Sequence, residues 1–139
     1  MRYLIAIILL LGLATNCDSV NLKQSDCDAE IIVDNNLFTN APNDSFNFVD
    51  IEIIQNCLKF TIEYGGGCGD IELKLISSEM VMESNPPQID VRFSLKDEDN
   101  CKANIRKEIL FNLTPIHELI NNQVILNIKN WDEAILYSF

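Results

Sequence analysis

Five cysteines are the residues of this chain with the most distinctive chemistry: Cys17, Cys27, Cys57, Cys68 and Cys101. Zinc binding is disfavoured, because no two of them have the separation of about two to four residues that is typical of a zinc knuckle. Disulfide bonds are the alternative, and they form in oxidising compartments. The last four cysteines can pair in three ways. We expect Cys27 with Cys57 and Cys68 with Cys101, because each lies close to the start of a predicted strand and crossed pairings would join turns at different ends of the fold.

Cys17 follows a segment that is typical of a secretory signal, with one positive charge and an apolar run too short to span a bilayer as a helix. The segment Leu13-Ala14-Thr15-Asn16-Cys17 resembles the end of a bacterial lipoprotein signal, although Asn16 stands where the strict pattern has Gly, Ala or Ser. Lipidation of Cys17 would leave an even number of cysteines, whereas ordinary cleavage after Ala14 would leave an odd one. We therefore expect a signal peptide over residues 1–16 and a lipid on Cys17.

The domain organisation follows from this cleavage site. Residues 17–26 are polar and show no hydrophobic period, so they are expected to form a tether, and residues 27–139 form the folded domain. The lipid would hold the protein on a membrane of the bacterial cell envelope. We expect this membrane to be the outer membrane. A secreted or soluble periplasmic protein is the alternative.

The chain is acidic, with 21 Asp and Glu against 10 Lys and Arg and a formal net charge of −11. This charge disfavours nucleic-acid binding and adhesion to anionic lipid, because both depend on basic residues. It is compatible with a cation or with a basic protein partner, such as a lysozyme.

An acidic turn, Asp97-Glu98-Asp99-Asn100, carries the oxygen ligands that Ca²⁺ prefers. We treat Asp97, Asp99 and Asn100 as a candidate site for weak Ca²⁺ binding. The spacing of an EF-hand is missing, so a solvated hairpin turn is the competing interpretation.

Two aromatic residues occur once each in the chain, Trp131 and His117. Trp131 lies in a predicted turn, where it could stack on a sugar or pack over the end of the fold. His117 has no evident partner base in the sequence, so we interpret it as a packing or surface residue. We predict no catalytic residues, no enzymatic activity and no cofactor.

Short strands must position these residues, because runs of alternating apolar residues recur along the chain. The run over residues 57–64 is the clearest, and Gly65-Gly66-Gly67 ends it. These glycines could cradle a phosphate, but residues 71–75 continue as a strand rather than a helix, which favours a plain turn. About seven or eight such strands predict an antiparallel β-sandwich, Ig-like in size, with a small β-barrel as the alternative.

Local irregularities are also predicted. The apolar residues change parity within residues 45–54, which indicates a β-bulge, and Gln55-Asn56 is the length of a hairpin turn. Lys107 interrupts an apolar run and indicates a second bulge or a strand break. Thr114-Pro115 predicts the start of one short helix, whereas residues 34–44 are expected to form a polar loop.

Several segments together resemble a family of small, uncharacterised lipoproteins from Bacteroidetes. The most specific are Gly65-Gly66-Gly67-Cys68 and Glu83-Ser84-Asn85-Pro86-Pro87-Gln88. The resemblance covers nearly all of the chain after the signal, and it implies a cell-envelope lipoprotein without implying an activity. Many members have a histidine soon after the glycine-cysteine segment, and Gly69-Asp70-Ile71 has none here.

The sequence therefore favours a cell-envelope lipoprotein that acts as a non-catalytic protein-interaction or inhibitor module. A carbohydrate-binding module, built around Trp131, is the first alternative, and weak Ca²⁺ binding is the second. The expected partners are the membrane, through the N-terminal lipid, and a protein or glycan of unknown identity.

Overall fold

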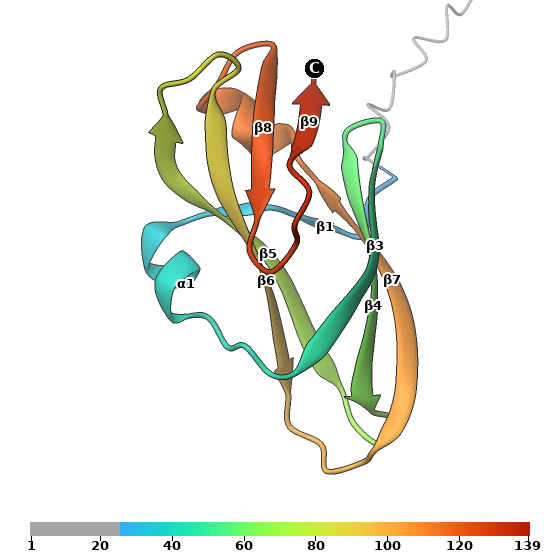
Figure 1. Cartoon of the computed structure of the whole chain (residues 1–139). Helices are drawn as coiled ribbons and strands as arrows, with labels where there is room; N and C mark the ends of the chain where they lie inside the picture. The colour runs from blue at the N-terminus through green and yellow to red at the C-terminus, as the bar shows by residue number, and fades with distance from the viewer. Residues whose placement is uncertain (1–25) are drawn as a thin grey trace, which may run out of the picture.

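The computed structural model describes residues 26–139, which form two packed β-sheets (Figure 1). The four-stranded sheet has the order β1 (Ala29–Glu30), β7 (Ala103–Asn112), β4 (Cys57–Gly66), β3 (Phe46–Ile54). The five-stranded sheet has the order β2 (Ile32–Val33), β5 (Ile71–Met82), β6 (Gln88–Asp97), β8 (Gln123–Ile128), β9 (Ile135–Ser138). The predicted all-β sandwich is confirmed, and the two sheets do not close into a single barrel.

The sheets are mixed rather than purely antiparallel, which corrects the expected topology. β1 pairs with β7, β2 with β5 and β6 with β8, each time in parallel. The chain passes from one sheet to the other at the buried Ile31, so β1 and β2 each add to the edge of a different sheet. Along the sequence, β7 and the 3₁₀ helix η1 (Thr114–Glu118) separate β6 from β8. This long crossover connection allows β6 and β8 to pair in parallel.

The β3–β4 hairpin follows the predicted pattern. Its register shifts between Phe48 and Asp50, where the parity of the apolar residues changes, so the predicted bulge is confirmed. Ile54 then pairs with Cys57 across the two-residue turn, in which Gln55 has a φ of 56°.

The bulge predicted at Lys107 is wrong. β4 and β7 pair without interruption from Cys57 opposite Asn112 to Gly66 opposite Ala103, and Lys107 lies opposite Ile62. Lys107 is exposed, and a long side chain of this kind can leave a sheet face and end in water without disturbing the ladder.

The polar loop expected over residues 34–44 contains a helix, α1 (Asn35–Asn40). Asp34 caps its first turn, since Oδ1 accepts a hydrogen bond from the amide of Leu37 at 2.8 Å. The buried Arg92 of β6 donates to the carbonyls of Phe38, Thr39 and Ala41 and so satisfies the end of the helix. The helix predicted at Thr114-Pro115 is present as η1.

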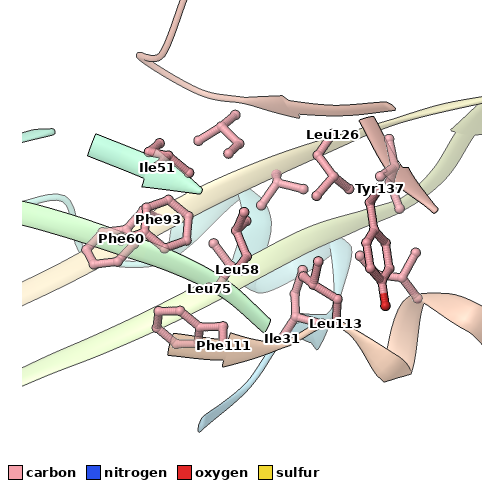
Figure 2. Packing of buried hydrophobic residues seen from close by; sticks show 14 of the residues in the cluster. Ile31, Ile51, Leu58, Phe60, Leu75, Phe93, Phe111, Leu113, Leu126 and Tyr137 are labelled. Carbon is pink, nitrogen blue, oxygen red and sulfur yellow. The ribbon is translucent and has the colours of Figure 1, made fainter. Parts of the chain in front are cut away.

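An aromatic cluster lies at the centre of the core, between the two sheets (Figure 2). The ring centroids of Phe60 and Phe93 are 4.9 Å apart, and both lie 6.0 Å from that of Phe111. Phe48 contacts Phe60 and Phe93, and it also contacts Trp131 at the edge of the sandwich.

The predictions for the N-terminal part of the chain are not tested by the structure. The signal peptide, the lipidated Cys17 and the tether as far as residue 25 lie outside the described residues. Within residues 26–139, no helix is long and apolar enough to cross a membrane.

Candidate binding pocket

A pocket of about 660 Å³ opens where the loop before β3 meets the turn between β8 and β9. We call it the Trp131 pocket. It is lined by Asn43, Asp44, Ser45, Phe46, Asn47, Phe48, Asn130, Trp131 and Asp132. More than eighty residues separate the two segments along the chain, so only the fold brings them together.

The first wall is held by the end of β6. The amide of Asp44 donates to the carbonyl of Leu95 at 3.0 Å, and Oδ2 of Asp44 accepts from the amide of Asp97 at 2.7 Å. Ser94 donates from Oγ to the carbonyl of Pro42 at 2.8 Å. The loop is therefore tied to a central part of the fold on both sides of Asn43.

The second wall is a tight turn after β8. Asn130 has a φ of 68°, a left-handed conformation that asparagine tolerates better than most residues. The amide of Trp131 donates to the carbonyl of Ile128 at 3.1 Å, which closes the turn. This geometry places the indole of Trp131 over the start of β3.

Trp131 packs on the core and also lines the pocket. Its ring lies 6.0 Å from that of Phe48 at an interplanar angle of 79°, and Phe48 meets Phe46 at 5.0 Å. A perpendicular contact covers at most one face of the indole. Trp131 stays half-buried, with the amides of Asn43, Asn47 and Asn130 also exposed around the pocket.

The lining carries two carboxylates, Asp44 and Asp132, and no lysine or arginine. Lys96 lies near Asp44, but its Nζ pairs with Oε1 of Glu98 at 2.6 Å. Glu98 raises the pKa of Lys96, with smaller contributions from Glu72 and Asp44. The pocket is therefore polar and mildly acidic.

The acidic turn that was considered for Ca²⁺ is organised by backbone amides. Oδ2 of Asp99 accepts hydrogen bonds from the amides of Gly67, Cys68 and Gly69 at 3.1, 3.0 and 3.0 Å. Its Oδ1 accepts from the amide of Cys101 at 2.9 Å. These hydrogen bonds, with that from Cys68 the largest contributor, lower the pKa of Asp99.

The other candidate ligands of this turn are Asp97 and Asn100. Oδ1 of Asp97 accepts from the amide of Asp99 at 2.9 Å, and Asn100 is exposed beside them. Among residues 26–139 no three His, Cys, Asp or Glu side chains gather as a metal site. Gly67, the last residue of the glycine run, is one of the three residues whose amides bind the carboxylate of Asp99.

His117 belongs to a stacked group at the other end of β9. Its ring lies 3.8 Å from that of Phe139 at 7°, and Nε2 lies 2.8 Å from the hydroxyl of Tyr137. That hydroxyl donates to Oδ1 of Asn56 at 3.3 Å. Burial lowers the pKa of His117 and raises that of Tyr137. The packing role predicted for His117 agrees with this arrangement.

The cysteines pair as the sequence led us to expect. Cys27 is bonded to Cys57 and Cys68 to Cys101, each pair with a Cα–Cα distance of 5.8 Å. The first bond ties the chain before β1 to the start of β4, and the second joins the two turns that Asp99 also connects.

Sequence reasoning identified Trp131 but not the rest of its pocket. The signal available was the polar run Asn43-Asp44-Ser45 directly before alternating Phe46 and Phe48. Such a run is also typical of any solvated loop, so it could not indicate which distant turn it would face.

No protein-family model matches this chain, and no curated protein is significantly similar to it. Two solved structures share its fold. A DUF1344 protein of unknown function from Bacteroides vulgatus has a TM-score of 0.52 and 12% identity, over 80% of this chain and 56% of its own. A NigD-like immunity protein from Bacteroides caccae has a TM-score of 0.56 and 12% identity, over 79% of this chain and 57% of its own.

At this identity the likeness shows a common all-β fold. The matched region is little more than half the length of either neighbour.

Proposed function

We propose that this chain is a non-catalytic protein-binding module of the bacterial cell envelope, of inhibitor or immunity type, anchored by a lipid on Cys17. The observation that carries the proposal is the surface around the edge strand β9. β9 pairs with β8 and with no other strand of the described residues, and its sequence, Ile135-Leu136-Tyr137-Ser138, contains no charge. An uncharged edge strand is a template on which another protein can add a strand.

Exposed apolar side chains surround this strand. We call them the β9 patch: Ile54, Leu119, Leu136 and Phe139, which are 40%, 38%, 54% and 37% exposed. Two contacts place Ile54, Leu119 and Phe139 at one end of the sandwich, and Leu136 lies on β9 itself. Phe139 stacks on His117, two residues before Leu119, and Tyr137 binds Asn56, two residues after Ile54. Apolar residues grouped in this way are typical of interaction sites.

The chemistry of the partner follows from the charge. A chain with a net charge of −11 attracts a basic protein over a distance and repels an acidic one. The solved NigD-like immunity protein supports the immunity type through the shared fold. Its low identity leaves the partner to be found by experiment.

Photo-crosslinking in the native envelope tests the protein-binding surface. Benzoylphenylalanine at Leu136 is expected to give one discrete adduct with a basic protein. The same group at Met80, on β5 and 72% exposed, is the matched control and should give none. Leu136→Asp should abolish the adduct formed from a crosslinker at Phe139, whereas Met80→Asp should leave it. Equal labelling from positions 136 and 80, or none from either, contradicts the proposal.

The lipid anchor has its own test, the intact mass of the protein extracted from its native membrane fraction. A diacyl or triacyl addition on a chain that begins at Cys17 is expected. Cys17→Ala should move the protein to the soluble fraction. An unmodified chain beginning at Thr15 would exclude the anchor and leave the protein-binding surface untouched.

A further inference from the structure

We infer that the Trp131 pocket is a glycan-binding site that takes neutral sugar units. It lies at the opposite end of β3 from the β9 patch, so this inference stands independently of the protein partner proposed above. Three features of the pocket favour such a ligand: an aromatic ring, the polar groups around it, and the charge of the lining.

The aromatic ring provides the platform. A sugar ring presents C–H groups on one face, and these pack on the electron-rich face of an indole. Trp131 is held in place by its perpendicular contact with Phe48 and by the amide hydrogen bond to Ile128. Trp131 is half-buried and lines the pocket, so part of the indole is accessible to a ligand. A platform fixed in this way loses little conformational entropy on binding.

The polar groups match the hydroxyls of a sugar. Three asparagines, Asn43, Asn47 and Asn130, line the pocket and are exposed, and each side-chain amide both donates and accepts hydrogen bonds. A sugar hydroxyl also donates and accepts, whereas a wholly apolar ligand would leave these amides unsatisfied. Asp132 adds an acceptor, and hydroxyl-to-carboxylate hydrogen bonds are short and strong.

The charge of the lining disfavours phosphate and sulfate ligands and makes a basic side chain the main rival to a sugar. Phosphate or sulfate groups are repelled, because Asp44 and Asp132 line the pocket without a lysine or arginine. A basic side chain could instead sit between Trp131 and these carboxylates. Against this, Oδ2 of Asp44 already accepts a hydrogen bond from the amide of Asp97. The three amides then favour a neutral polyol.

The size agrees with such a ligand. The pocket volume of about 660 Å³ lies within the range of roughly 300–1,000 Å³ in which small-molecule sites are found.

Fluorescence is the direct test, because Trp131 is the only tryptophan of the chain. The mature protein would be titrated with glucose, galactose, mannose, xylose and N-acetylglucosamine, and with cellotriose, maltotriose and chitotriose. At least one should change the emission of Trp131 with a saturable dependence on concentration. L-arginine and a short polylysine would be titrated in parallel as probes for the rival.

Calorimetry with the sugar that binds best then tests the residues. Trp131→Ala should weaken binding by about tenfold or more, and Asn47→Ala should weaken it less. Trp131→Phe keeps an aromatic side chain beside Phe48 and serves if the alanine variant fails to fold. Asn104→Ala is the matched control for Asn47→Ala. Asn104 is also an exposed asparagine, and its strand β7 belongs to the same four-stranded sheet as β3, which carries Asn47.

Three results would overturn the inference. The first is that no sugar of the panel changes the emission. The second is that arginine or polylysine saturates it while the sugars do not, which would assign the pocket to a basic side chain. The third is sugar binding that survives unchanged in both Trp131→Ala and Asn47→Ala. None of these bears on crosslinking at Leu136, so failure here is distinguishable from failure of the protein-binding proposal.

Discussion

The carboxylate of Asp99 accepts a hydrogen bond from the backbone amide of Cys68 at 3.0 Å, and through this contact the turn after β6 holds the turn after β4. Gly67 has a φ of 112°, which only glycine adopts without strain, and this conformation helps three successive amides to converge on one oxygen. The disulfide between Cys68 and Cys101 joins the same two turns covalently.

Neutralising Asp99 should therefore destabilise the protein in a pH-dependent way. The hydrogen bonds lower its pKa below the ordinary value of 3.8, so its contribution is present above pH 3.8 and is lost as the pH falls through the lower, folded-state pKa. Asp99→Asn should lower the melting temperature at neutral pH, and the difference from wild type should shrink in strong acid. Asp70→Asn is the control, because Asp70 is an exposed carboxylate in the turn after β4, whose amides bind Asp99. A difference that stays constant with pH would contradict this role.

Arg92 should be a major contributor to stability despite its position on a strand. Arg92 is 7% exposed, and its guanidinium donates to three carbonyls at the end of α1. Arg92→Lys cannot reproduce this fork, and we expect a loss of roughly 2–3 kcal/mol in the free energy of unfolding, measured with urea. Arg106→Lys is the matched control, because Arg106 is exposed and its ion pair with Glu63, at 3.6 Å, should contribute less than about 1 kcal/mol. Equal losses in the two variants would show that the carbonyl contacts of Arg92 add little.

Arg92 also shows why part of the fold could not be predicted from the sequence. The alternation of residues 57–64 and the parity change near Phe48 are local signals, and they correctly predicted β4 and the bulge in β3. α1 has only six residues and no apolar repeat, and the group that satisfies its last carbonyls lies more than fifty residues further along the chain. The parallel pairs and the meeting of Asn43 with Trp131 likewise depend on how the two sheets pack.

The two disulfides should differ in their energetic coupling to Asp99. Their loops of 30 and 33 residues predict a stabilisation of about 3 to 4 kcal/mol each in the chain-entropy model. Replacing Cys68 and Cys101 by alanine should be non-additive with Asp99→Asn, because Asp99 binds the amides of both cysteines. Replacing Cys27 and Cys57 should be additive with Asp99→Asn within about 0.5 kcal/mol. Double-mutant cycles by urea unfolding measure the coupling energy of Asp99 with each disulfide. Equal coupling energies in the two cycles would show that the Asp99 contacts do not depend on the neighbouring disulfide.

His117 should make the protein less stable in mild acid. Burial lowers its pKa below the ordinary value of 6.5, so between the two values the unfolded chain binds more protons than the folded one. The stabilising contribution of neutral His117 should therefore be complete above pH 6.5. The free energy of unfolding should fall as the pH drops from 6.5 through the folded-state pKa. Since His117 is the only histidine, His117→Gln should remove most of this slope, whereas Asp99→Asn should not. Urea unfolding across this pH window gives the slope, and the imidazole proton resonances of the folded protein report the pKa directly. A slope that persists in His117→Gln would assign the titration to another group.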